Sequence, residues 1–311
     1  MSFYAFAWVA LGLASGPSVE AREAVAQLSP RWPACVAREG RVAVRPWDLK
    51  ARSEVEVACE QLALGHAVLE ATPERSLALA EGLLRKKGGL PDLWAQSAIL
   101  AGRALVRLGR PDSAWEYFQR AQSRGVRPTG PRALYDFARA AQFTNHQTEA
   151  LVALRAASTQ MAFMSPSFRQ GIYLEAGAIS ILENKLQPAL GFLELARREP
   201  GAVEYRSLVR ALLSTTLELL GKPEQARTVL SEIPDIWALT EGPLDPGFEP
   251  NRGRTLTPFL DPILAKTAAA VLLSTADPNA SAELFEELRS DPKAPEILRK
   301  LAELKLRGAN P

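Results

Sequence analysis

The feature that most constrains the fold of this chain is a repeated pairing of small residues twelve positions apart. Five pairs follow one another along the 311 residues: Gly102 with Ala114, Ala138 with Ala150, Gly177 with Ala189, Ser214 with Ala226, and Ala270 with Ala282. In the first four pairs a bulky apolar residue follows four positions later: Phe118, Leu154, Leu193 and Leu230. Where two antiparallel helices cross closely, only Gly, Ala or Ser fits at the contact. The pattern therefore predicts a series of helical hairpins.

The turns inside these hairpins carry their own signal. Gly109, Asn145, Asn184 and Gly221 each stand just after the first helix of a predicted pair. Gly and Asn tolerate the left-handed backbone conformation that commonly ends a helix. We therefore expect a left-handed residue at each of these four positions.

Composition agrees with an all-α fold and argues against two classes of partner. Alanine and leucine are abundant, which favours helices over strands. The 37 basic and 35 acidic residues nearly balance, and the basic ones are dispersed along the chain. We therefore expect no nucleic-acid partner and no membrane-binding basic face.

One hairpin resembles a tetratricopeptide repeat at six positions. The small, large, turn, small, aromatic and small residues of that family's consensus correspond here to Gly102, Leu105, Gly109, Ala114, Phe118 and Ala121. The resemblance implies a right-handed superhelical solenoid of about five to six helical hairpins with a C-terminal capping helix. It also implies a protein that binds other proteins. Successive small residues from Gly65 to Ser214 are 37, 36, 39 and 37 apart, whereas the family period is about 34, so longer turns between hairpins are expected.

The pattern divides the chain into five parts. They are a signal peptide over 1–21, an irregular N-terminal cap over 22–53, the repeats over 54–233, a Pro- and Gly-rich insertion over 234–262, and a final hairpin with its capping helix over 263–311. The aromatic residues of the insertion favour its folding back onto the repeats.

The N-terminal segment is typical of an export signal. An uncharged apolar run extends from Phe3 to Ala14. Val19 and Ala21 provide small residues at the two positions that signal peptidase recognises before its cleavage site. The basic residue that usually begins such a signal is missing. We expect cleavage after Ala21 and export to a bacterial periplasm or beyond. An uncleaved short anchor and a buried first helix of a cytoplasmic protein remain the alternatives.

The only two cysteines, Cys35 and Cys59, precede the regular repeats. In an oxidising compartment, a bridge between them would attach the N-terminal cap to the first helix, with a stabilisation of roughly 3 kcal/mol. Two buried free thiols are the alternative. A metal site is not expected, because neither cysteine has a second ligand at the usual spacing.

No catalytic motif is present in the sequence. With only two histidines, His66 and His146, the chain has no pair at metal-ligand spacing, and it has no nucleophile elbow or phosphate-binding loop. We therefore predict no enzyme activity and no cofactor. An enzyme acting on cell wall or polysaccharide remains a weaker alternative, and would need two carboxylates facing a cleft.

The first helix of each hairpin would line the concave surface of a solenoid, so its non-core positions are the candidate binding site. In the middle repeats these positions are basic and aromatic: Arg103, Arg107, Arg132, Tyr135, Arg139 and Phe143. In the next two repeats they are largely apolar, with Leu174, Ile181 and Leu208 among them. We expect the arginines to form an open stripe that faces the carboxylates of an acidic peptide, with the aromatic residues as anchors. The alternative is that the arginines are ordinary solvated residues and that the insertion covers the apolar positions.

Beside that weaker enzymatic alternative, two non-catalytic functions remain open from the sequence. The first is a protein-binding scaffold or adaptor that holds a partner segment in its groove. The second is a structural subunit of an envelope complex, such as a secretion, pilus or motility machine, with large permanent contacts. The sequence does not indicate an oligomeric state.

Overall fold

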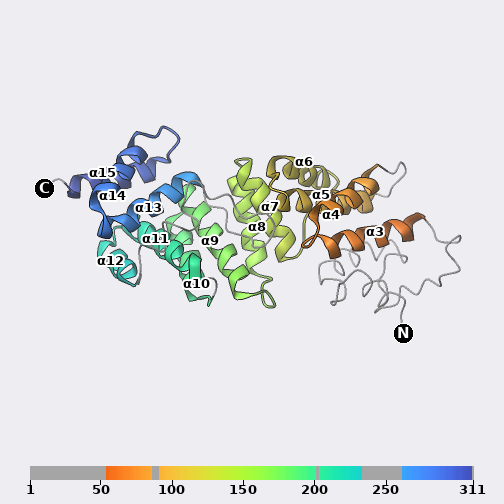
Figure 1. Ribbon diagram of the computed structural model, residues 1–311, viewed down its shortest axis with the longest axis horizontal. Coiled ribbons are helices and arrows are strands. Elements are labelled where there is room, and N and C mark those ends of the chain that lie inside the picture. The colour runs from red at the N-terminus through yellow and green to blue at the C-terminus, as the bar shows by residue number, and fades with distance from the viewer. Residues whose placement is uncertain (1–53, 86–90, 201–202, 233–260, 310–311) are drawn as a thin grey trace. The chain divides into compact units, whose positions relative to one another are not determined.

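The computed structural model describes residues 54–85, 91–200, 203–232 and 261–309, and these residues form thirteen helices and no strand (Figure 1). The helices are α3 (Glu54–Val68), α4 (Pro73–Leu84), α5 (Pro91–Arg107), α6 (Pro111–Gln122), α7 (Pro131–Phe143), α8 (Gln147–Ser158), α9 (Pro166–Leu182), α10 (Leu186–Arg198), α11 (Val203–Leu219), α12 (Pro223–Ser231), α13 (Pro262–Ala276), α14 (Pro278–Ser290) and α15 (Glu296–Ala309). The predicted all-α class is confirmed for this part of the chain.

The helix ends follow from local chemistry. Proline begins many of the helices, where its missing N–H costs nothing and its fixed φ suits the first turn. Asp261 and Asp277 accept hydrogen bonds from the backbone N–H groups of Ile263 and Ala280, which caps α13 and α14. The four predicted turn residues all adopt positive φ: Gly109 at 69°, Asn145 at 62°, Asn184 at 55° and Gly221 at 71°. That expectation is confirmed.

The chain divides into two compact units, residues 1–146 and 147–311. In the first unit, α5 packs against α4 and α6 and also contacts α3 and α7. Its core includes Leu62, Leu69, Ala80 and Leu100. A Cβ atom on Gly102 of α5 would lie 3.0 Å from the Phe118 ring of α6. The predicted need for a small residue at this crossing is confirmed.

The second unit contains α8 to α15. Within it, α9 packs against α8 and α10, and α11 contacts α9, α10, α12 and α13. A Cβ atom on Gly177 would lie 2.7 Å from Leu193 Cγ, so this crossing also requires glycine. The last predicted pair is one residue out of register. Ser281, and not Ala282, is the buried small residue of α14, and its hydroxyl donates to the Ala270 carbonyl at 2.7 Å.

Several predictions fall outside the described residues. The signal peptide and the N-terminal cap lie there, as does nearly all of the predicted insertion. Ala138 belongs to the first unit and Ala150 to the second, so their pairing stays a prediction, although both residues are buried. Among the helices that the structure describes, none is both long and apolar enough to cross a lipid bilayer.

Candidate functional site

The first unit brings together charged residues from three first helices. His66 lies in the last turn of α3 and Glu70 just after the end of that helix, while Arg103 and Arg107 lie one turn apart on α5. The third helix, α7, contributes Arg132, Asp136 and Arg139. Residues spaced by three or four share a helix face. Because α5 contacts both α3 and α7, these faces meet.

Asp136 is the centre of this polar cluster. Its side chain is fully buried, and its Oδ2 accepts from Arg103 Nε at 2.9 Å. Arg107 pairs with the other carboxylate oxygen at 3.1 Å and with Glu70 at 3.1 Å. Glu70 also pairs with Arg132 at 3.4 Å. A chain of ion pairs therefore connects the end of α3 with α5 and α7.

His66 of α3 also belongs to this cluster. Its Nδ1 lies 3.3 Å from Arg103 Nη1. Since arginine can only donate, Nδ1 must accept, and the proton of the neutral ring belongs on Nε2. Burial, reinforced by the charge of Arg103, lowers the pKa of His66 to about 3. The ring is therefore neutral at physiological pH, and His66 acts here as a hydrogen-bond acceptor.

The expectation of an open arginine stripe is only partly correct. The structure does bring Arg103, Arg107 and Arg132 together. However, Arg103 and Tyr135 are each only 1% exposed. The prediction that these two side chains face solvent is therefore wrong. Arg103 can be buried because its guanidinium forms an ion pair with Asp136 inside the protein. Asp136 was not among the predicted residues, although an acidic residue among the core positions of an amphipathic helix indicates a buried partner.

The remaining predicted residues lie nearer the surface. The side chains of Arg107 and Arg132 are 12% and 41% exposed, and Phe143 is 41% exposed at the end of α7. The Arg139 guanidinium lies 5.8 Å from the centre of the Tyr135 ring. Arg132 and Phe143 thus form the accessible part of the predicted site, and Glu70, which is not among the six predicted residues, pairs with Arg132 beside them.

The cluster contains buried polar atoms that no described residue satisfies. They are His66 Nε2, Arg103 Nη2, Arg107 Nε, Arg139 Nε and both amide atoms of Gln142; Asp136 Oδ1 also lacks a hydrogen bond, but it forms an ion pair with Arg107. Buried polar groups in folded proteins are nearly always hydrogen-bonded, to protein, water or ligand. All of these atoms except Asp136 Oδ1, which already faces Arg107, and the Gln142 oxygen are donors, given the His66 tautomer above. The cluster is therefore suited to acceptor groups such as carboxylates or peptide carbonyls.

In the second unit, first-helix positions that were expected at the surface are buried. Leu174, Ile181 and Leu208 are all within its core. A first helix packs against its own hairpin partner and also against the first helices on either side, as α11 does with α9 and α13. These contacts bury the positions of Leu174, Ile181 and Leu208 on α9 and α11. The prediction of an apolar binding surface at these three residues is wrong.

Of the two cysteines predicted to form a disulfide bridge, the structure describes only Cys59. Cys59 is buried in the core of the first unit, on α3. Cys35 lies outside the described residues, so the bridge stays a prediction. Among the residues with described placement, no group of three or more His, Cys, Asp or Glu side chains could hold a metal ion.

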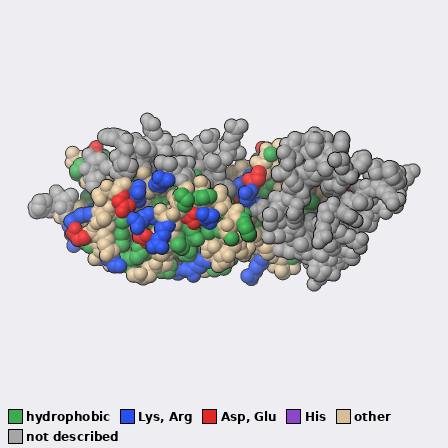
Figure 2. Space-filling view, turned by 90° about the horizontal axis from the view of Figure 1, so that it is seen from below, with side chains coloured by type: hydrophobic (Ala, Val, Ile, Leu, Met, Phe, Trp, Pro, Cys, Tyr) green, Lys and Arg blue, Asp and Glu red, His purple; other side chains and the backbone are tan. Residues whose placement is uncertain are grey.

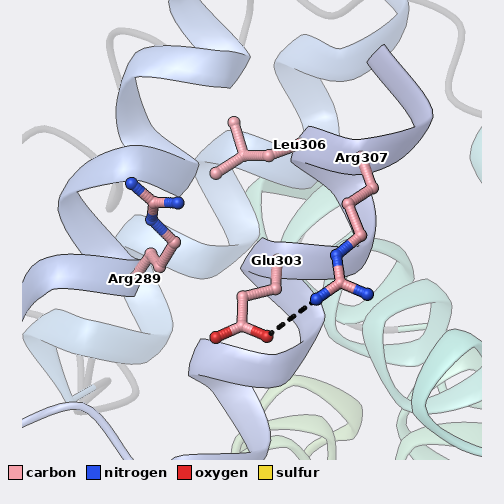
Figure 3. A pocket seen from close by; sticks show the side chains of 4 residues that line it. All are labelled: Arg289, Glu303, Leu306 and Arg307. Carbon is pink, nitrogen blue, oxygen red and sulfur yellow. Dashed lines mark ion pairs between the residues drawn. The ribbon is translucent and has the colours of Figure 1, made fainter. Parts of the chain in front are cut away.

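On the face that Figure 2 shows, the described residues mix basic, acidic and hydrophobic side chains. One hollow of about 500 Å³ lies between α14 and α15, lined by Arg289, Glu303, Leu306 and Arg307 (Figure 3). Its arginines already have counterions: Arg307 pairs with Glu303 at 3.9 Å, and Arg289 pairs with Glu286. This hollow therefore offers no unmatched charge to a ligand.

Comparison with known proteins does not assign the chain to a family. No family model matches its sequence, and no curated protein matches it.

Proposed function

We propose that this chain is a non-catalytic, tetratricopeptide-like scaffold that binds a partner protein along its first helices. In this proposal the hairpins stack into a right-handed solenoid, and the partner contributes an acidic segment. The observation that carries the proposal is the polar cluster of α3, α5 and α7, which contains buried donors without acceptors.

The order of helix contacts supports the repeat architecture. First helices contact one another across hairpins, as α5 does with α3 and α7, and as α11 does with α9 and α13. In repeat proteins, such neighbouring helices form an extended binding surface. Glu70, Arg132 and Phe143 give this surface in the first unit both charge and an aromatic anchor.

Affinity capture from the source cells tests the proposal. The partner recovered with the wild-type protein should be lost with Arg132→Glu and with Phe143→Ala, both on α7. Arg120→Glu is the matched control, because Arg120 is exposed on the second helix α6 and carries the same charge change. If no protein is recovered specifically, or if both α7 variants recover it as well as the control, the proposal is wrong.

We further propose that the chain acts after export. The support is the apolar run from Phe3 to Ala14 with small residues at the predicted cleavage site. Mass spectrometry of the native protein should find a mature terminus at Arg22. An intact Met1 in the soluble cytoplasmic fraction would contradict export.

A further inference from the structure

A second hollow, of about 230 Å³, lies in the second unit where α9, α10 and α11 come together. Its lining includes Gln170 of α9, Arg197 and Arg198 at the end of α10, Glu199, and Arg206 and Arg210 of α11. Four guanidinium groups therefore line one small space.

The acidic residues nearby are already engaged. Glu199 accepts two hydrogen bonds from Arg169, at 2.9 and 2.7 Å. Glu232 is shared between Arg197 and Arg210, at 3.3 and 3.5 Å. The hollow therefore keeps an excess of positive charge after its internal ion pairs are counted.

Two of the arginines have no such partner. No described residue forms an ion pair with Arg198 or Arg206, and both residues are exposed. Arg206 also lies in the first turn of α11, where the helix dipole favours an anion. An incoming carboxylate could pair with these two side chains without displacing an existing ion pair.

Gln170 provides an independent observation that points to a ligand. Its side chain is only 1% exposed, and its Nε2 donates to the Ala196 carbonyl at 3.4 Å. Its Oε1 is buried without a hydrogen-bond partner. A buried acceptor without a donor is unfavourable, so a ligand that brings an N–H group would be favoured here.

We infer that this hollow is a binding site for an acidic segment of a partner protein. The ligand places a Glu or Asp carboxylate between Arg198 and Arg206 and donates a backbone N–H to Gln170 Oε1. The hollow is smaller than the pockets that hold cofactors or drug-sized molecules, roughly 300–1,000 Å³, and it suits one side chain. The near balance of 37 basic and 35 acidic residues argues against a nucleic-acid ligand.

This inference rests on the proposed function in taking the ligand to be part of a protein. The site is nevertheless separate from the polar cluster, since its residues belong to the second unit. Variants at Arg198 or Arg206 leave the α7 surface unchanged, so the two proposals can fail independently.

Fluorescence anisotropy with the full chain tests the site. The probe is a fluorescein-labelled peptide of six glutamates with blocked ends, compared with the same peptide made of glutamines. Arg198→Glu and Arg206→Glu should each weaken glutamate-peptide binding by about tenfold, since each loses a charge-assisted hydrogen bond. Arg227→Glu on α12 is the matched control, because its side chain is 72% exposed and lies outside the hollow, and it should bind as the wild type does.

The Gln170→Leu variant tests whether the peptide contacts Gln170 or is only attracted by the charge of the arginines. It retains every arginine but removes the acceptor, together with the 3.4 Å hydrogen bond from Nε2 to the Ala196 carbonyl. Binding should weaken severalfold under conditions where urea denaturation shows the variant to be folded. The proposal is overturned if the glutamate peptide does not bind, or if Arg206→Glu and Arg227→Glu bind it equally. Stronger binding of a thymidine oligonucleotide than of the glutamate peptide, lost in Arg206→Glu, would overturn it in favour of phosphate recognition.

Discussion

Arg103 and Asp136, 33 residues apart in the sequence, form a hydrogen-bonded ion pair of 2.9 Å between α5 and α7, with side chains 2% and 0% exposed. A buried pair of this kind contributes little net stability, because desolvation offsets the attraction. Removing one partner is different, since it leaves a buried charge without a counterion.

We therefore predict that Asp136→Asn lowers the free energy of unfolding by about 3–5 kcal/mol. The double variant Arg103→Met/Asp136→Asn should be destabilised by less than the sum of the two single changes, because the stranded charge is gone. Urea denaturation of all four proteins measures this coupling. Strictly additive effects would show that the pair does not act as a unit. For the same reason, Arg103→Glu is unsuited to testing partner binding, since it would place two carboxylates in the core.

A second prediction concerns the pH dependence of stability at His66. Its pKa of about 3 in the folded chain lies below the unfolded value of about 6.5. Between these two pH values, His66 is protonated in the unfolded chain and neutral in the folded chain. Stability is then fully present above about pH 6.5 and falls as the pH drops toward about 3.

Between about pH 7.5 and about pH 5, His66 should account for a loss of about 2 kcal/mol in the free energy of unfolding. The His66→Gln variant should lose correspondingly less stability over this range. Urea denaturation of both proteins at the two pH values measures the difference. If the two proteins lost equal stability, His66 would not be held neutral by burial and by Arg103.

A third prediction tests the helix crossings. Gly102→Leu and Gly177→Leu should each destabilise the protein by about 1–3 kcal/mol, because the added side chain meets Phe118 or Leu193. Gly82→Leu on α4 is the control: a Cβ atom added there would meet nothing within 4 Å, and a better helix former should be neutral or stabilising. Equal urea midpoints for the three variants would contradict the close crossings.

Local features of the fold could be predicted because each depends on residues close in sequence. The positive φ of Asn145 and Asn184 follows from the turn in which each lies. The crossing of Gly102 with Phe118 follows from spacing within one hairpin. The register error at Ala282 has a similar local origin, since Ser281 is equally small and spacing alone cannot choose between them.

The candidate site could be predicted less well, because it depends on packing between hairpins. Spacing within α5 and α7 identifies the helix faces that carry Arg103 and Asp136. It does not show that these two side chains form a buried ion pair with each other. The same cause explains the buried Leu174 and Leu208, which lie on first helices enclosed by their neighbours.

A fourth prediction concerns the cysteines. Nonreducing peptide mapping of the native protein should recover a peptide in which Cys35 is linked to Cys59. Because such a bridge restricts the unfolded chain, its reduction should lower the free energy of unfolding by roughly 3 kcal/mol. Quantitative alkylation of both thiols in freshly isolated protein would contradict the bridge.

The central claim, that a partner binds along the first helices of the first unit, is tested most directly by site-specific photocrosslinking. A benzoylphenylalanine is placed at Phe143 on α7 or, as the control, at Gln119, which is exposed on the second helix α6. We expect a covalent adduct with one partner protein from position 143, joined to an acidic segment of that partner, and none from position 119. Adducts from position 119 alone, or equal adducts from both positions, would contradict the claim.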